Sequence, residues 1–476
     1  MSTWSGDFAC SSPPIAAGED DGMSEKTMLG DDLAAFGVTA DVTPETPRHF
    51  AEFGSEKMIF DVRLGPQAVC HDDVIYIVYQ ANPHGLAAHP HIIAYDRRAR
   101  SWSHPVRLGE NPARYDHHLA PVLWIDDDDH LHVLYGCHLT PGTHLVSRKP
   151  RAIDEWAQGP TIANSISYPT LVRAHDNTLL LFYRALGHLG FWAYRTSDDG
   201  GYSWSMARRL IHFAQSPSED DDADCWAGAY PSVCPSPDGR SLHIGFVYWD
   251  ERRGMHPVYR IRKRSRARYH LYYLRLDIPS GALYTIDGKR LKAPVNRGLA
   301  DAACKVWDTG YELSNMPSIA LGAQGEPHFL LPVSDQSAWR SRFHFVTRQE
   351  RAWHRVALTD TNNTWAGGLL RAEGPNDFVA YLVSGQDADE TLFYSGGTVE
   401  QWSSRDRGVT WHRDRSLVPA PDLVYNNPRP VQNSRGGDLC DHLVFFGWQG
   451  PGSIEADPSP LRNRGRAYLW GGGEWL

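Results

Sequence analysis

Two histidines, His118 and His138, are the residues whose type and spacing best fit chemistry in this chain. His118 ends the polar run Tyr115-Asp116-His117-His118, and His138 follows a strand predicted over residues 132–135. A hairpin of this length can bring the ends of paired strands together, so we expect the two imidazoles to lie close to each other. Imidazole changes charge near neutral pH, which suits it to proton transfer. Because the chain has 23 histidines, such a pair also arises by chance.

The elements that must position these histidines are short strands. From about residue 58 onward, short apolar runs rich in β-branched and aromatic side chains alternate with turn residues, and no long helical period competes with them. The clearest runs are residues 74–79, 132–135, 179–183, 243–248, 272–276 and 442–446. Residues 1–45 are rich in Ser, Gly, Asp, Pro and Ala, and they predict an irregular N-terminal segment. Residues 46–476 are expected to form one all-β catalytic domain.

Two segments of the chain repeat one turn motif. Residues 197–204 and 404–411 both fit the pattern S-x-D-x-G-x-(S/T)-W, which is the Asp-box of neuraminidase-type repeats. The Asp is expected to cap backbone amides, the Gly to supply an unusual backbone angle, and the Trp to pin the turn to the sheet. The motif therefore indicates the fold, and it says little about the chemistry.

Less regular copies of this turn can be placed by the aromatic residue that closes them. Together with those of the two full motifs, the closing residues are Trp102, Trp156, Trp204, Tyr284, Trp353 and Trp411. They predict six sheets, and the strands between Leu443 and Trp475, together with a strand near Phe60, predict a seventh that closes a ring. We therefore predict a seven-bladed β-propeller, with six blades as the alternative.

The overall charge and the apolar content limit the classes of partner. The formal net charge of −10 argues against nucleic acid, because nucleic-acid binders usually present a basic face. It does not argue against an anionic sugar, since one local arginine cluster can bind a carboxylate. No apolar run reaches the ~18 residues of a membrane helix, and no signal peptide is visible, so no membrane partner is expected. The odd number of cysteines implies no disulfide framework, and a monomer is expected.

Several motifs follow one another between residues 115 and 204. They read Asp116-His117-His118, Asp129-His130-Leu131-His132-Val133, Gly136-Cys137-His138, Ser147-Arg148-Lys149-Pro150, Ser167-Tyr168-Pro169 and Phe182-Tyr183-Arg184. In this order they resemble polysaccharide lyases with neuraminidase-type repeats, which include the ulvan lyases and the rhamnosyl-glucuronate lyases. The chain departs from the ulvan lyase pattern around Gly136-Cys137-His138 and after Tyr183-Arg184. This departure favours another rhamnose–glucuronate linkage over ulvan itself.

The resemblance implies roles for residues at matching positions. The implied catalytic residues are His118, His138 and Tyr183. The implied arginine for the substrate carboxylate is Arg184 or Arg195, and the further candidates for the substrate pocket are His117, Tyr230 and Tyr248. The implied partner is an anionic polysaccharide or oligosaccharide that contains glucuronate, which in turn implies secretion.

The implied reaction is a β-elimination. A base removes the proton at C5 of the uronate, a cation or donor neutralises the carboxylate as charge builds up there, and an acid protonates the leaving oxygen at C4. In D-glucuronate the C5 proton and the C4 oxygen lie on one face, so base and acid must approach from the same side. One histidine is expected to act as the base, with Tyr183 or the other histidine as the acid. No cofactor is required for this chemistry.

A structural metal is a separate expectation from the resemblance. Some of these lyases hold a zinc ion with His and Cys, and the donors on neighbouring predicted strands here are His243, His270, His328 and Cys304. The alternative is a buried thiol among hydrogen-bonded histidines. The acidic runs at residues 126–129 and 219–222 suggest calcium, but neither has the alternating ligands of a known loop, so solvated turns are the simpler interpretation.

Two other classes of function remain open from the sequence. A glycoside hydrolase of the α-L-rhamnosidase type would act on the same sugar pair, but a usual hydrolase needs two carboxylates across the bond. The sequence offers no convincing pair at inner-strand positions, and Asp116 and Asp250 stay open as candidates. A non-catalytic sugar-binding propeller would keep exposed aromatic residues and would not need the two histidines and the tyrosine.

Overall fold

The computed structural model describes most of the chain from residue 48 onward. The described residues are 48–54, 58–85, 87–112, 116–187, 190–213, 227–250, 267–310, 312–334, 341–361, 367–385, 396–421, 423–437, 439–449 and 464–476. Contacts divide the chain between Val38 and Thr39, and all described residues belong to the second unit. The predicted irregular segment, residues 1–45, lies outside the described residues.

The described residues form an all-β fold, as the short apolar runs predict. Five of the six hydrogen-bonded sheets found among them each take their strands from one stretch of the chain, apart from one short strand that pairs with the sheet following its own stretch. One sheet contains β7 (Val122–Ile125), β8 (Leu131–Tyr135), β10 (Thr143–Ser147) and β11 (Trp156–Gln158). The next contains β12 (Ile166–Arg173), β13 (Leu179–Ala185), β14 (Phe191–Ser197) and β15 (Arg208–Ile211), with β9 (His138–Thr140) paired to β12.

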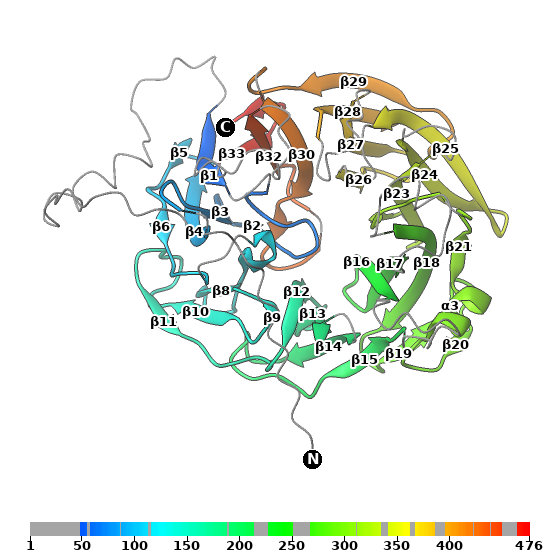
Figure 1. Cartoon of the computed structure of the whole chain (residues 1–476), viewed down its shortest axis with the longest axis horizontal. Helices are drawn as coiled ribbons and strands as arrows, with labels where there is room; N and C mark the ends of the chain where they lie inside the picture. The colour runs from blue at the N-terminus through cyan, green and yellow to red at the C-terminus, as the bar shows by residue number, and fades with distance from the viewer. Residues whose placement is uncertain are drawn as a thin grey trace, which may run out of the picture. The chain divides into compact units, whose positions relative to one another are not determined.

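Three further sheets continue this order along the chain (Figure 1). The first of them contains β16 (Ala227–Pro235), β17 (Ser241–Asp250), β18 (Ala267–Asp277), β19 (Ala282–Tyr284), β20 (Arg290–Leu291) and β21 (Lys305–Trp307). The second contains β22 (Ser318–Leu321), β23 (Pro327–Ser334), β24 (Ser341–Gln349) and β25 (Ala352–Thr361). The third contains β26 (Gly368–Ala372), β27 (Phe378–Ser384), β28 (Thr398–Ser404) and β29 (His412–Leu417).

The largest sheet joins the first described strands to the last ones. Its early strands are β1 (His49–Gly54), β2 (Ala68–His71), β3 (Val74–Ala81), β4 (His89–Asp96), β5 (Ser101–Trp102) and β6 (Val106–Arg107). Its late strands are β30 (Leu423–Pro430), β31 (Gln432–Asn433), β32 (Leu443–Gln449), β33 (Gly465–Gly471) and β34 (Glu474–Trp475). Strand β1 pairs with both β33 and β3, and β2 runs parallel to β31. The beginning and the end of this unit are therefore held together by backbone hydrogen bonds.

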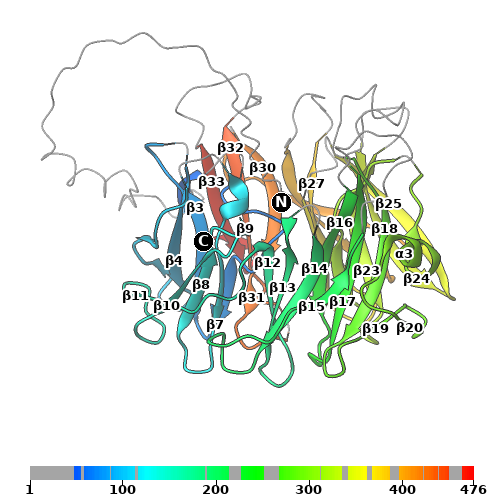
Figure 2. The same cartoon turned by 60° about the horizontal axis from the view of Figure 1, so that its bottom comes forward.

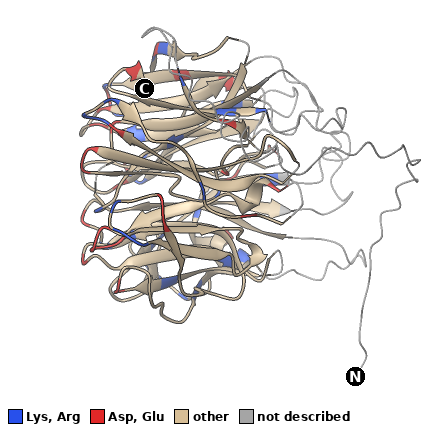
Figure 3. Cartoon of the chain, turned by 90° about the vertical axis from the view of Figure 1, so that its left-hand side faces the viewer, with Lys and Arg blue, Asp and Glu red and all other residues tan. Residues whose placement is uncertain are grey.

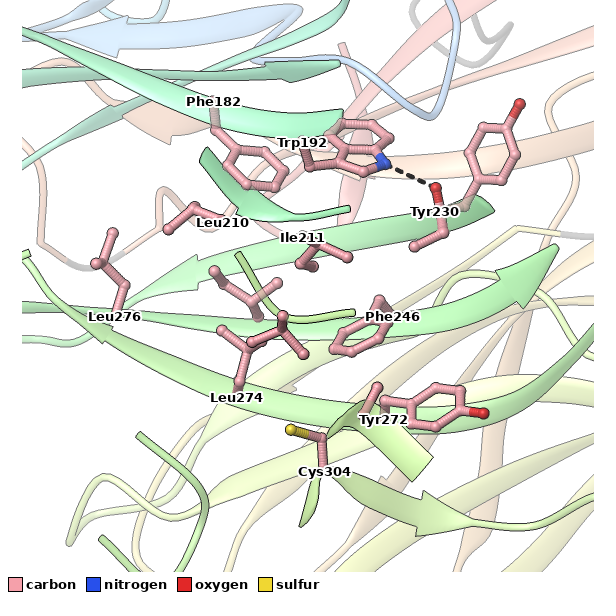
Figure 4. Packing of buried hydrophobic residues seen from close by; sticks show 14 of the residues in the cluster. Phe182, Trp192, Leu210, Ile211, Tyr230, Phe246, Tyr272, Leu274, Leu276 and Cys304 are labelled. Atoms are coloured by element: carbon pink, nitrogen blue, oxygen red, sulfur yellow. Dashed lines mark hydrogen bonds between the residues drawn. The ribbon is translucent and has the colours of Figure 1, made fainter. Parts of the chain in front are cut away.

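Hydrophobic clusters lie between successive sheets. Figure 4 shows one of them, in which Phe182 and Trp192 from one sheet pack near Phe246 and Tyr272 from the next. Other clusters join β2–β6 to β7–β11 and β7–β11 to β12–β15, and another packs early strands against β32 and β33. Because both faces of a sheet are covered, middle strands such as β13 and β23 are buried at every residue, whereas β29, which pairs only with β28, is mostly exposed.

The Asp-box turns form as their residue types predict. Asp199 accepts hydrogen bonds from the backbone amides of Tyr202 and Ser203 at 3.0 and 2.8 Å, and Trp204 Nε1 donates to the carbonyl of Gly201 at 2.9 Å. Gly201 has a φ of 110°, which favours glycine. The second box repeats these bonds around Asp406.

The described residues also contain a 3₁₀ turn, η1 (His117–Leu119), and a short α-helix, α3 (Arg297–Ala303). In Figure 2, η1 lies at the upper end of the strands. Among the described residues, no helix has the length and hydropathy needed to cross a membrane. Acidic and basic residues are interspersed on the turns in Figure 3.

Candidate active site

One carboxylate bridges the two histidines that the sequence singles out. Asp116 caps η1 by accepting a hydrogen bond from the His118 amide. Its two oxygens also accept bonds from Nδ1 of His118 at 2.5 Å and Nδ1 of His138 at 3.1 Å. The imidazole centroids lie 4.2 Å apart. The predicted meeting of the two histidines is confirmed, and because Nδ1 of each ring lies against Asp116, Nε2 of each ring is the nitrogen left for a substrate.

The electrostatics of this group keep Asp116 charged and His118 neutral. Burial would raise the pKa of Asp116, but the hydrogen bonds from the two histidines outweigh it and hold that pKa well below its usual range. Burial also lowers the pKa of His118 well below its usual value, helped by the nearby charges of His117 and Arg63 and opposed by the bond to Asp116. His138 Nε2 is buried and has no hydrogen-bond partner. His118 therefore offers an unprotonated Nε2 next to a fixed carboxylate.

A buried ion pair between Arg63 and Asp61 lies next to His117, the neighbour of His118. Arg63 donates to both oxygens of Asp61 at 2.8 and 2.5 Å, and its Nη2 donates to His117 Nε2 at 2.7 Å. Gln80 donates to the His117 carbonyl at 3.0 Å. The His117 ring lies against that of His118, with centroids 4.1 Å apart and the ring planes tilted by 34°. His117, proposed from sequence as a substrate-binding residue, therefore lies beside the site and is bonded to protein groups.

A tyrosine from β12 is the aromatic residue against the histidine pair. The ring of Tyr168 lies 5.6 Å from that of His118 and 5.9 Å from that of His138. Its φ is +56°, and the pairing of β12 with β13 shifts register between Ser167 and Thr170, which indicates a β-bulge. Bulges re-aim side chains and are common next to active sites. Burial raises the pKa of Tyr168, so its hydroxyl stays protonated at neutral pH.

Arginine side chains stack on this tyrosine and on its neighbour. Arg184 lies over the Tyr168 ring at 4.7 Å and donates to the Tyr230 hydroxyl at 3.3 Å. Arg63 lies over Tyr168 at 5.0 Å, and Arg268 lies over Tyr230 at 4.2 Å. Burial would raise the pKa of Tyr230, but these guanidinium groups outweigh it and lower the pKa to about 8. The cluster is thus rich in positive charge next to the histidines.

Arg184 has unused hydrogen-bonding capacity. Its side chain is 3% exposed, and its Nε and Nη2 have no hydrogen-bond partner. A buried guanidinium without a full set of acceptors is costly, so it is suited to an anionic ligand such as a carboxylate. Arg184 and Tyr230, both predicted from sequence, are brought to the site.

Three other predicted site residues lie elsewhere in the fold. Tyr183 is adjacent to Arg184 on β13, so its side chain faces the opposite side of the sheet. It is buried among residues of the β7–β11 sheet, and its hydroxyl accepts a bond from Arg195 Nε at 3.2 Å. Arg195 also donates to the Ser205 carbonyl at 2.6 Å. Tyr248 packs under Arg297, whose guanidinium lies 3.6 Å from its ring. The expectation that Tyr183 lies next to the histidines is wrong, because side chains alternate along β13 and that of Tyr183 lies on the opposite face of the sheet from Arg184.

The four predicted zinc donors do not converge, which corrects that expectation. His243 Nδ1 bonds to the Tyr273 hydroxyl at 2.8 Å, and His328 Nδ1 bonds to Thr347 at 2.9 Å. His270 Nδ1 accepts from the Thr309 amide at 3.2 Å, and Cys304 is buried in a hydrophobic cluster. His243, His270 and His328 lie on β17, β18 and β23 and each bonds to a different partner, whereas Cys304 ends α3. The alternative interpretation, a buried thiol and hydrogen-bonded histidines, fits the structure.

The acidic run at residues 126–129 forms a capped turn. Asp126 accepts bonds from the amides of Asp128 and His130 at 3.0 and 2.8 Å, and Asp129 accepts bonds from Arg151. These contacts agree with the interpretation as a turn in place of a calcium loop. The other acidic run, residues 219–222, lies outside the described residues.

Sequence reasoning missed the roles of several residues in the cluster. The sequence presents Asp116 as part of a motif and as a candidate hydrolase carboxylate, and Tyr168 as part of a motif, without the roles that the structure gives them. Their place in the ordered motifs could have marked them as site residues. Asp116 stands two residues before His118, and Tyr168 lies between Ser167 and Pro169. Arg63 and Arg268 come from distant strands and loops, and no local pattern marks them.

The fold and the site together define an all-β, repeat-built protein with a polar cluster of histidine, tyrosine and arginine. Residues 75–361 match the model of the BNR repeat-containing family, and the chain belongs to that family. The expected resemblance to repeat-containing polysaccharide lyases is also confirmed. The chain is 23% identical over 393 residues to an ulvan lyase of Pseudoalteromonas sp. (strain PLSV), which covers 74% of each protein.

Two further comparisons extend this similarity over most of the chain. An ulvan lyase of Nonlabens ulvanivorans is 23% identical over 465 residues, covering 89% of this chain and 94% of that protein. The solved structure of a PL25 ulvan lyase superimposes with a TM-score of 0.70 at 18% identity, covering 90% of this chain and 97% of that one. The structural similarity therefore concerns the fold.

Proposed function

We propose that this protein is a polysaccharide lyase that cleaves a rhamnose–glucuronate linkage by β-elimination at the uronate. The observation that carries the proposal is the Asp116 carboxylate that bridges His118 and His138, beside a buried arginine with unpartnered N–H groups. The ulvan lyases among the relatives support the same reaction class. A solved structure of one such enzyme, which shares the fold, is bound to -[GlcA(1-4)Rha3S]-.

The base in this proposal is His118. Asp116 holds its Nδ1–H, and its lowered pKa keeps Nε2 free of a proton near neutral pH. His138, which shares the same carboxylate, offers its unpartnered Nε2 to the substrate as a second contact. The proton from C5 of the uronate passes to His118 Nε2.

The acid and the electrostatic stabiliser come from the tyrosine–arginine stack. Tyr168 lies against both histidine rings and keeps its proton, so it is suited to protonate the C4 oxygen of the leaving sugar from the same side as the base. Arg184 binds the uronate carboxylate, where negative charge builds up in the transition state. Tyr230 holds Arg184 in place through its hydroxyl.

The proposal also includes the number of propeller blades and the place where the enzyme acts. Strands β30, β32, β33 and β34 can be grouped as one blade and β2, β3, β4 and β5 as another, which with the other five sheets makes seven blades. The substrate class is an anionic glucuronate-containing polymer outside the cell, so we propose that the enzyme acts there, as a monomer and without nucleic-acid or membrane partners.

The test is to measure the ultraviolet absorbance of the C4–C5 unsaturated uronate while the protein acts on ulvan and on a rhamnose-capped glucuronate glycan such as gum arabic. Wild type should produce the absorbance on at least one of them, and His118→Ala and His138→Ala should abolish it. His412→Ala, on the exposed strand β29, is the matched control and should keep it. Rhamnose released without the absorbance would contradict the proposal and favour a hydrolase. No product from either substrate would favour a binding protein.

A further inference from the structure

Metal-binding side chains gather at the junction between the beginning and the end of the domain. Cys70 lies on β2, and Cys440, Asp441 and His442 precede β32. Cys440 Sγ lies 3.1 Å from His442 Nδ1 and 3.8 Å from Asp441 Oδ1, and His442 Nδ1 lies 2.5 Å from Asp441 Oδ1. Cys70 lines the same surface pocket as Cys440 and Asp441. None of these residues takes part in the histidine site.

We propose that Cys70, Cys440, Asp441 and His442 form a zinc site that fastens β2 to the segment before β32. Two sulfurs, one imidazole nitrogen and one carboxylate oxygen are a donor set that Zn²⁺ prefers, and four ligands complete its tetrahedral shell. Cys440, Asp441 and His442 already bring three donor atoms within 4.8 Å of one another. A surface pocket lined by Cys70, Cys440 and Asp441 gives an ion a path to the cluster.

The surrounding charges suit a divalent cation. Two thiolates and one carboxylate around Zn²⁺ would leave one net negative charge. Arg97, whose Nη1 lies 4.0 Å from Cys440 Sγ, can compensate for it. Arg371 Nη1 donates to the Cys440 carbonyl at 3.0 Å and fixes the backbone that presents the thiol. Such outer contacts orient ligands in metal sites.

The position of the site gives it a structural role. Cys70 pairs with Asn433 in the parallel β2–β31 contact, and the Cys70 carbonyl accepts a bond from the Ser434 amide at 2.9 Å. This parallel contact is short, because it joins a four-residue strand to a two-residue strand. Zinc bound here would link segments that are far apart in the sequence. Because zinc would bind the folded chain and not the unfolded one, its binding would raise the free energy of unfolding.

The test uses the full chain, reduced and treated with chelator, then loaded with Zn²⁺ or with Co²⁺ as a spectroscopic probe. We expect one zinc per chain, a thiolate-to-cobalt charge-transfer band, and a higher Tm with zinc. Cys440→Ser should lose the bound zinc, the band and the shift in Tm. Cys304→Ser, a matched change at a buried free thiol in another cluster, should keep all three.

A milder variant keeps the proposal testable if Cys440→Ser fails to fold. Asp441 is exposed, so Asp441→Ala should fold normally and bind zinc at least about tenfold more weakly, because losing even an outer contact of a metal ligand costs about 10- to 100-fold in affinity. Zinc retained by Cys440→Ser, unchanged affinity in Asp441→Ala, or no zinc on the reduced wild type would overturn the proposal. A Cys70–Cys440 disulfide in the purified chain, with no zinc bound after reduction, would also overturn it.

Discussion

The imidazole rings of His118 and His138 lie with their centroids 4.2 Å apart, although one belongs to η1 and the other to β9. They meet because Asp116 accepts a hydrogen bond from Nδ1 of each. A single carboxylate thus fixes the orientation and the tautomer of both rings, and its loss should affect the two histidines together.

Asp116→Asn should lower kcat by about 100-fold or more, because an amide has one acceptor oxygen and cannot hold both Nδ1–H groups. The pH profile separates this role from a loss of structure. Asp116 raises the pKa of His118 against the effect of burial, so its removal should shift the acidic limb of kcat/KM to lower pH. Rates measured across pH check this, with Asp127→Asn, on the exposed turn, as the control. An unshifted acidic limb would contradict the assigned role.

Arg184→Ala should lower kcat/KM on a glucuronate polymer by about 10- to 100-fold, since a hydrogen bond to a charged group contributes about 1.5–3 kcal/mol. The comparison that isolates the carboxylate uses a substrate whose uronate is methyl-esterified. On that substrate the difference between wild type and variant should largely disappear. Arg195→Ala is the matched control, because Arg195 bonds to Tyr183 and Ser205 and should leave both rates nearly unchanged. A larger loss in Arg195→Ala would reverse the assignment.

Tyr168→Phe and Tyr183→Phe make a matched pair, since each removes one hydroxyl from a buried tyrosine. Tyr168→Phe should lower kcat by about 100-fold or more, because it removes the proposed acid. Tyr183→Phe should leave kcat within a few-fold and should lower the free energy of unfolding by about 1 kcal/mol, through the lost bond from Arg195. Steady-state rates and denaturant titrations of both variants check this. The reverse pattern would restore Tyr183 as the acid.

The local parts of the fold could be predicted from the sequence because their signals are local. In the Asp-box, Asp199 caps amides three and four residues away, so the motif itself contains its hydrogen bonds. The closing aromatic residues also mark the outer strands of their sheets as predicted, since Trp102 and Trp156 each pair with a residue of the preceding strand. The pairing of β1 with β33 depends on segments at opposite ends of the unit, and only the general expectation of closure anticipated it.

The site could be predicted only in part, because the side of a strand that a residue faces depends on local irregularities. Tyr183 and Arg184 are neighbours on β13, and only Arg184 reaches the cluster. Tyr168 reaches it through a bulge with a positive φ, which no pattern in the sequence marks. The same limit explains why the zinc prediction was wrong. His243 and His328 are on neighbouring sheets, but their side chains bond to Tyr273 and Thr347 and do not meet at one point.

His243 should make the stability of the fold depend on pH. Burial, with a smaller contribution from Arg275, lowers the pKa of His243 to about 4, and its Nδ1 accepts the hydroxyl proton of Tyr273 at 2.8 Å. Between about pH 4 and 6.5 the unfolded chain binds a proton that the folded chain does not bind, so stability should rise with pH across this window. The contribution is at most about 3 kcal/mol, since each pKa unit corresponds to about 1.4 kcal/mol.

Burial also lowers the pKa of other histidines, such as the buried His328 and the partly buried His344, so the measurement must be a difference between proteins. His243→Asn keeps an acceptor for Tyr273 near the position of Nδ1 but does not titrate. Denaturant unfolding at several pH values should therefore give a smaller slope of stability against pH for this variant than for wild type. His412→Asn, on the exposed strand β29, should keep the wild-type slope. Equal slopes for wild type and His243→Asn would show that His243 is protonated in the folded chain, against the effect of its burial.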